Sequence, residues 1–197
     1  MTRFRFDPAA YGPACLELLR DERLCELGSG SPNEAARAML AALTPDTLAS
    51  ERTIHDRQMA DCCLAGLWLL HNFLDESHTL SQEIHSTTGS YWHGIMHRRE
   101  PDYGNSKYWF QQVGDHAVFA QLQLAARELA EQSGSSSPPD RAADFLRTQT
   151  AWEPFRFIDL CEAATCGRSS SELLCQRVAL AEWQLLFDHC FEQAFGD

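Results

Sequence analysis

The sequence is poor in basic residues and has no long apolar run. Its 16 lysines and arginines stand against 28 aspartates and glutamates, which gives a formal charge of −12. Long-range repulsion opposes binding to nucleic acid or to an anionic membrane surface, so neither is expected as a partner. The most apolar stretch, Met59 to Leu74, is interrupted by Asp61, His71 and Asn72 and is too short to span a bilayer.

Several motifs of common enzyme classes are also missing. The chain has no Gly-x-Ser-x-Gly elbow, no phosphate-binding loop ending in Gly-Lys-Ser/Thr and no Gly-x-Gly-x-x-Gly. Its eight cysteines form no Cys-x-x-Cys pair, which excludes a zinc ribbon or a dithiol redox motif. The residues from Met1 to Pro8 lack the apolar core of a signal peptide. We therefore expect reduced, mostly buried cysteines and a cytoplasmic location.

The apolar residues that are present recur at spacings of three and four, which is typical of helices. An alternating strand pattern is absent. The predicted fold class is all-α: a helical bundle with short loops, in a single domain over residues 1–197. Residues 133–139, rich in Ser and Pro, predict a flexible surface loop rather than a domain boundary, because the chain after them is short for an independent core. The predicted helices cover residues 14–27, 32–43, 55–76, 91–99, 118–132, 159–165 and 170–195, the last of them opened by a capping box of Ser169 and Glu172.

Local signals predict where the helices of the central region begin and end. Residues 87–90 are expected to break the chain, with Ser90 as the cap of the following helix. That helix should end near Arg99, because the residue before Pro101 is disfavoured in the helical conformation. Residues 101–106 are then expected to form a loop.

The segment from residue 71 to residue 116 holds six of the eight histidines and many of the aromatic residues. Within it, His93 and His97 are four residues apart and so share one face of a helix. This spacing allows two imidazoles to bind one divalent metal ion. Glu100 would extend the pattern to His-x3-His-x2-Glu. Gly94 stands where a His-Glu-x-x-His metalloprotease has its general base, so that family's pattern is absent.

A second series lies upstream, where His71, Asp75 and His78 also fall on one helix face. If the chain turns between the two segments, two helices would direct imidazoles toward each other, as in metal sites of helical bundles. Histidine ligands favour zinc, iron, copper or nickel over magnesium or calcium. His55 and His85 are expected on the surface, and His189 in the core. The predicted ligands of a divalent transition metal are therefore His93, His97, His71 and His78.

Cations and aromatic residues surround the same segment. Arg98, Arg99 and Lys107 can hold a phosphate or carboxylate group of a ligand. Alternatively, the two arginines only complement the negative C-terminal end of their helix. Trp92 and Tyr108 can form the wall of a ligand pocket, although aromatic residues at this density also serve a core.

These patterns favour a metal-binding helical protein that acts as a metal-dependent hydrolase on a small polar or anionic substrate. A bound metal ion would activate water. Glu100 and Asp102 are the predicted catalytic residues, acting as general bases. The predicted substrate-binding residues are Arg98, Arg99, Lys107, Tyr108 and Trp92.

Two alternatives from other classes remain open. In the first, the protein is a non-catalytic module that binds a small-molecule ligand, and the histidines only donate hydrogen bonds. In the second, it is a homo-oligomeric interaction protein, and the apolar stripes of the last helix form a homodimer interface. The metal content of the protein separates the first alternative from the hydrolase.

Overall fold

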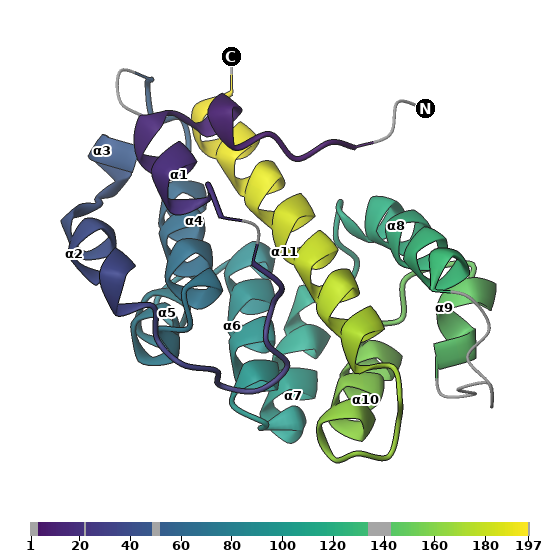
Figure 1. Cartoon of the computed structure of the whole chain (residues 1–197). Helices are drawn as coiled ribbons and strands as arrows, with labels where there is room; N and C mark the ends of the chain where they lie inside the picture. The colour runs from purple at the N-terminus through teal and green to yellow at the C-terminus, as the bar shows by residue number, and fades with distance from the viewer. Residues whose placement is uncertain (1–3, 22, 49–51, 134–142, 197) are drawn as a thin grey trace.

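Every regular element that the computed structural model describes is a helix (Figure 1). The structure describes residues 4–21, 23–48, 52–133 and 143–196, so most of the predicted surface loop at 133–139 lies outside the described residues. The all-α prediction is confirmed. In chain order the elements are η1 (Pro8–Tyr11), α1 (Pro13–Leu18), α2 (Glu34–Ala42), α3 (Pro45–Leu48), α4 (Arg57–Leu70), α5 (Leu74–Ser81), α6 (Thr87–Arg99), α7 (Tyr103–Val113), α8 (Phe119–Gln132), α9 (Asp144–Thr148), α10 (Pro154–Thr165) and α11 (Glu172–Phe195).

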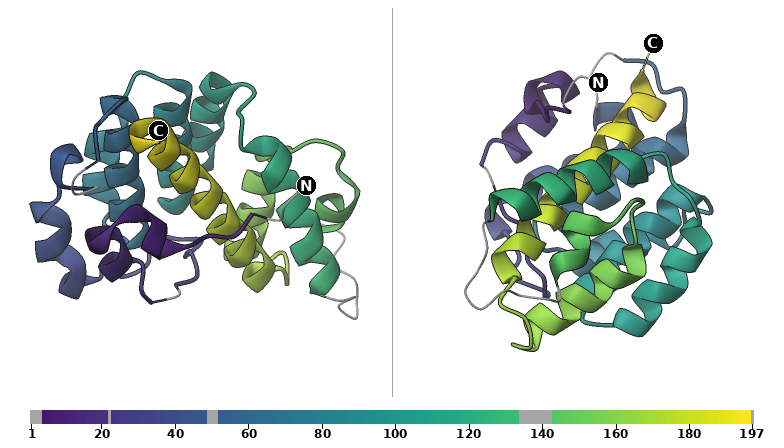
Figure 2. Two further views of the ribbon diagram at one scale, coloured as in Figure 1. Left: turned by 90° about the horizontal axis from the view of Figure 1, so that it is seen from above. Right: turned by 90° about the vertical axis from the view of Figure 1, so that its right-hand side faces the viewer.

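The last helix, α11, lies between two groups of helices. It packs against α4 on one side and against α8 and α10 on the other (Figures 1 and 2). Most of its apolar side chains are buried within the chain, and Val178, Leu186 and Cys190 are fully inaccessible to solvent, whereas Leu173 is 51% exposed. The packing of α11 against α4, α8 and α10 uses most of the apolar residues that were expected to form a homodimer interface. The homodimer therefore stays a prediction, and no surface for it is identified.

Polar contacts fix the position of α6 relative to α11. The Tyr91 hydroxyl donates a hydrogen bond to Glu182 Oε1 over 3.0 Å, and the Arg98 guanidinium forms an ion pair with the same carboxylate. The Arg98 and Glu182 side chains are both almost completely buried. Breaking such a pair would leave one charge buried without a partner, which is costly. The pair therefore determines which face of α6 is directed toward the core.

Two glycines allow α6 to approach its neighbours closely. A Cβ atom on Gly66 of α4 would lie 2.8 Å from the Trp92 ring. A Cβ atom on Gly94 of α6 would lie 2.8 Å from Phe110 Cδ2 of α7. Both distances are shorter than a side chain tolerates, so larger residues would push the helices apart. Gly94 thus has a packing role at the position where a metalloprotease carries its glutamate.

The predicted continuous helix over residues 55–76 is wrong, because the chain forms two helices there. α4 ends at Leu70 and α5 begins at Leu74. Between them, Asn72 adopts a left-handed conformation with φ 64°. Its side chain donates to the Ser31 carbonyl oxygen over 2.9 Å and accepts from Arg99 Nη2 over 2.7 Å. Contacts with distant segments therefore stabilise a break that local helix propensity does not favour.

The predicted boundaries around α6 and α7 are also corrected. Residues 87–90 form the first turn of α6, and Ser86 rather than Ser90 is its cap, with Ser86 Oγ accepting from Gly89 N over 3.0 Å. The predicted end near Arg99 is confirmed. Residues 103–106 belong to α7 instead of a loop, because the Asp102 side chain caps a new helix directly after Pro101.

Other boundaries differ less. The first predicted helix stops at Leu18, and α10 begins five residues before its predicted start, at Pro154. All eight cysteines are free thiols, and only Cys166 is exposed, as the sequence predicts. Among the described residues, none of the helices combines the length and the apolar character needed to cross a membrane.

Candidate metal centre

Three histidines from two helices come together beside α7. His78 of α5 and His93 and His97 of α6 each offer a ring nitrogen, and these three atoms lie within 4.8 Å of one another. The exposed fractions of His93 and His97 are only 2% and 7%, whereas His78 is half-buried. The chain thus turns between α5 and α6 so that the two helices face each other, an arrangement that the sequence left open. This group can hold a metal ion.

The spacing of His93 and His97 places their rings one helical turn apart on α6. Their Nε2 atoms are 3.0 Å from each other. Two nitrogen ligands of a tetrahedral zinc ion lie about 3.3 Å apart, given zinc–nitrogen distances of about 2.0–2.1 Å. The His78 ring approaches both, with ring-centroid distances of 4.7 Å to His93 and 5.4 Å to His97. The pair is therefore close to the geometry of two ligands of one ion.

A serine on α5 determines which nitrogen of His93 carries a proton. Ser81 Oγ donates to the His78 carbonyl oxygen over 3.3 Å and lies 3.0 Å from His93 Nδ1. A hydroxyl has one proton, which Ser81 can give to either acceptor. When the carbonyl oxygen takes this proton, His93 Nδ1 donates to Ser81, which leaves the lone pair on His93 Nε2. That nitrogen is the one directed at the other histidines.

A carboxylate has the same effect on His97. His97 Nδ1 lies 3.2 Å from Glu100 Oε2, at an ion-pair distance without the alignment of a good hydrogen bond. The negative charge favours the proton on Nδ1 and so leaves the lone pair on Nε2. Carboxylates commonly orient metal-binding histidines in this way. Glu100 therefore fits the role of a partner that orients His97.

Burial keeps these imidazoles neutral. Desolvation, together with the nearby His97 and His78, lowers the pKa of His93 to about 3. Desolvation also lowers the pKa of His97, an effect that the negative charge of Glu100 partly opposes. Only a neutral imidazole binds a metal ion. Both rings are thus in the ligating form at neutral pH.

Aromatic side chains of α7 cover the solvent side of the group. The Trp109 ring is half-buried and its centroid lies 4.2 Å from that of His93. Tyr108 follows at 5.6 Å from Trp109 and is 54% exposed. Tyr108 is thus exposed beside Trp109, and its contact with a ligand stays a prediction.

His71 is separate from this group. Its Nε2 donates to the Leu18 carbonyl oxygen over 3.1 Å, and its Nδ1 then accepts from Asn33 Nδ2 over 2.9 Å. Both ring nitrogens are therefore occupied in holding α1 and α2 against the end of α4. In a continuous helix His71 and His78 would lie on one face. The break at Asn72 separates them.

Three predicted substrate-binding residues are buried and have partners in the protein. Besides its ion pair with Glu182, the Arg98 guanidinium lies 4.8 Å from the centroid of the Phe157 ring. Arg99 Nε donates to the Gly28 carbonyl oxygen over 2.7 Å. The Trp92 ring is fully buried, and its Nε1 donates to Cys190 Sγ over 3.4 Å. The structure thus gives these three side chains roles in packing, and they do not reach a ligand at the histidines.

The two remaining charged residues of the prediction lie near the surface. Lys107 Nζ is 2.5 Å from Asp159 Oδ1 and so is paired within the protein. Asp102 accepts from the backbone nitrogen of Asn105 over 3.1 Å and from Asn105 Nδ2 over 3.2 Å. Asp102 is thus held as the cap of α7, close to His97.

Ser81 and Trp109 are site residues that the sequence reasoning missed. Ser81 stands three residues after His78, on nearly the same face of a helix, and this spacing was the available signal. Trp109 belongs to the aromatic run of the region, but nothing in the sequence distinguishes it from core residues. His55 and His85 are exposed, as predicted.

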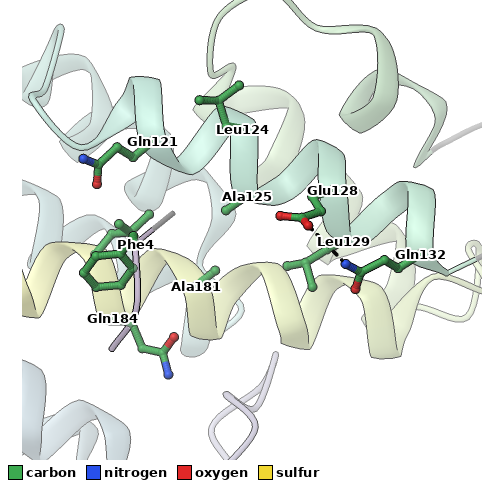
Figure 3. A pocket seen from close by; sticks show the side chains of 10 residues that line it. Phe4, Gln121, Leu124, Ala125, Glu128, Leu129, Gln132, Ala181 and Gln184 are labelled. Carbon is green, nitrogen blue, oxygen red and sulfur yellow. Dashed lines mark hydrogen bonds between the residues drawn. The ribbon is translucent and has the colours of Figure 1, made fainter. Parts of the chain in front are cut away.

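The structure also contains open hollows, including the following two. One, of about 370 Å³, adjoins Glu100 and is lined in part by Asp75, Glu76 and Arg37. The other, of about 320 Å³, lies between α8 and α11 and is partly covered by Phe4 (Figure 3). Neither histidine nor cysteine lines this second hollow, so it offers little for catalysis.

Comparison with known proteins gives no further guide to the site. The chain matches no family model, no curated protein and no solved structure. The functional assignment therefore depends on the histidine group and its surroundings.

Proposed function

We propose that this protein binds one divalent transition metal ion through His78, His93 and His97 and hydrolyses a small polar substrate. The observation that carries the proposal is the convergence of three imidazoles whose Nε2 lone pairs, in His93 and His97, are set by Ser81 and Glu100. Neutral imidazoles suit zinc, iron, copper and nickel. The donor set of the described residues thus fits such an ion.

The site has the features of a catalytic rather than a closed structural centre. Three protein ligands leave one coordination position for water, as in zinc hydrolases. A bound ion would lower the pKa of that water to about 7 and supply the nucleophile. His78 and Trp109 are only partly buried, so a substrate can approach from their side.

The carboxylates have different roles from those that the sequence favours. Glu100 orients His97, and Asp102 caps α7. Neither is needed as a general base when the metal ion itself promotes deprotonation of water. An anionic substrate is also less favoured than the sequence indicates. The three cations expected to bind it, Arg98, Arg99 and Lys107, have partners within the protein.

Metal analysis tests the binding site directly. We expect about one metal ion per chain in untagged protein, by elemental mass spectrometry, and almost none in the His93→Ala/His97→Ala and His78→Ala variants. His85→Ala is the matched control, because it removes an exposed histidine of the same region. Circular dichroism would show that the variants remain helical. Negligible metal in the wild type after exposure to zinc, iron, copper and nickel would contradict the proposal.

Hydrolysis requires a separate test. Hydrolysis of a neutral ester such as 4-nitrophenyl acetate should disappear after chelation and return when the ion is restored. Activity that is unchanged in metal-free protein would rule out the proposed mechanism. A protein that binds the ion and cleaves no ester, amide or phosphoester would instead be the non-catalytic binding module.

A further inference from the structure

The solvent side of the histidine group combines carboxylates with an aromatic ring. Glu100 Oε2 lies 3.2 Å from His97 Nδ1, and the Glu100 side chain is 35% exposed. The backbone nitrogen of Asp102 donates to the His97 carbonyl oxygen over 3.0 Å, so this exposed residue follows directly on the turn that carries His97. Glu100 is therefore close enough to act on a ligand at the site, and Asp102 adds a second negative charge to the same turn of chain.

The adjoining hollow extends this negative surface. Its lining includes Asp75, Glu76 and Glu100. Arg37 also lines it, but Arg37 Nη1 lies 2.7 Å from Glu76 Oε1 and its Nε lies 2.7 Å from Glu34 Oε2. The positive charge of Arg37 is thus balanced by two carboxylates.

The other cations near the site are balanced in the same way. Arg98 pairs with Glu182, and Lys107 pairs with Asp159. Arg99 is buried, and it donates to Asn72 Oδ1 and to backbone carbonyl oxygens. An anionic ligand would therefore meet carboxylates without a compensating cation from these three residues.

Trp109 supplies a surface that attracts positive charge. Its ring lies beside His93 and keeps part of its area accessible, next to the exposed Tyr108 ring. Among aromatic side chains, the indole ring binds ammonium groups most strongly. Such a cation–π interaction contributes about 0.5–2 kcal/mol, depending on exposure. The negative charges of Glu100 and Asp102 would offset the positive charge of the bound ion, which otherwise repels an ammonium group at this ring.

We propose that the metal site takes an organic cation, a molecule in which an ammonium group lies against Trp109 while a polar group reaches the histidines. This inference rests on the proposed metal centre and names its class of substrate. The substrate class that we infer is thus opposite in charge to the anionic substrate that the sequence favours. The attraction to the negative surface should weaken as salt screens the carboxylates.

Three probes of one shape and different charge test this inference. They are benzohydroxamates with a 4-trimethylammonium group, a 4-tert-butyl group or a 4-sulfonate group, and they bind the metal ion through the hydroxamate. The visible spectrum of the cobalt-loaded protein reports their affinities. We expect the cationic probe to bind at least about tenfold more tightly than the anionic probe at low salt, with a smaller ratio at high salt.

Variants identify the groups that cause the preference. Trp109→Leu should reduce the affinity for the cationic probe more than for the neutral one. Asp102→Asn removes a negative charge but preserves a good helix cap, so α7 should remain folded. The affinity for the cationic probe, relative to that for the anionic probe, should decrease. Glu172→Gln is the matched control, because it removes an equally exposed negative charge at the start of the distant helix α11.

The outcomes separate this inference from the metal site itself. Equal affinities for the three probes, or tighter binding of the anion, in protein that carries its full metal complement would overturn the cationic substrate and leave the metal centre standing. A loss of preference in Glu172→Gln equal to that in Asp102→Asn would also overturn it, since the effect would then come from net charge alone. Failure to bind cobalt would remove both proposals.

Discussion

The Nε2 atoms of His93 and His97 face each other at 3.0 Å across one turn of α6. Ser81 holds the Nδ1 atom of the first ring and Glu100 lies beside that of the second. In the metal-free protein the contact between the two Nε2 atoms is a hydrogen bond, in which one Nε2 atom donates and the other accepts. With both rings protonated on Nδ1, both Nε2 lone pairs would be available to one ion, which is the form that metal binding requires.

Ser81→Ala should weaken metal binding by about 10–100-fold, because partners of ligating histidines contribute that much to affinity. Without Ser81 the proton can move to His93 Nε2, the nitrogen that is needed for the ion. Competition with a chromophoric chelator measures the change. Ser77→Ala is the matched control, since the Ser77 hydroxyl is buried on the same helix without a hydrogen-bond partner. An affinity equal to that of the wild type in Ser81→Ala would contradict the tautomer argument.

Gly94→Ala should destabilise the protein by about 1–3 kcal/mol, because the added methyl group collides with Phe110 and separates α6 from α7. Urea unfolding measures the loss. Adding Phe110→Leu should restore part of it by providing room. Gly28→Ala, at a position with nothing within 4 Å of an added Cβ atom, should change stability little. If Gly94→Ala were as stable as the wild type, the close approach of the helices would be disproved.

Arg98→Met should cost about 3–5 kcal/mol in unfolding free energy, because it leaves the Glu182 carboxylate buried without its partner. The double variant Arg98→Met/Glu182→Gln should recover much of this, since the amide keeps an oxygen for the Tyr91 hydroxyl. Lys107→Met should cost less than about 1 kcal/mol, as expected for a pair near the surface. Similar losses in the two single variants would show that the burial of Arg98 has no energetic consequence.

Metal-free protein should lose stability as the pH falls from 7 to 5. Burial, together with the positive charge of His189, lowers the pKa of His116 to about 4. The unfolded state, with a histidine pKa of about 6.5, binds the proton more readily in this range. The stability is therefore fully present above pH 6.5 and is lost as the pH falls toward 4, by about 2 kcal/mol at pH 5 from His116 alone.

Urea unfolding of wild type and His116→Gln in the presence of a chelator measures this contribution. The variant should be less stable at pH 7, because it loses the contact with Thr88, but its stability should depend less on pH. His55→Gln, which replaces an exposed histidine, should retain the pH dependence of the wild type. Identical pH dependence in wild type and His116→Gln would contradict the lowered pKa.

The sequence predicts the helices better than their ends. The periodicity of α8 and α11 is carried by many residues, and both helices lie within two residues of their predicted limits at 118–132 and 170–195. The break at Asn72 could not be predicted, because its left-handed conformation depends on contacts with Ser31 and Arg99. The start of α7 could have been predicted, because Asp102 is a good helix cap. The adjacent Pro101 instead favoured a loop.

The residues of the candidate site also differ in whether local sequence or tertiary structure determines their place. The sequence by itself determined the all-α fold and the pairing of His93 with His97, because a helix repeats every 3.6 residues and both facts depend only on local spacing. Tertiary structure decided that His78 rather than His71 joins this pair, since the break at Asn72 turns α5 toward α6. It also decided that Arg98 is directed into the core, because its partner Glu182 lies 84 residues away and no local pattern connects them.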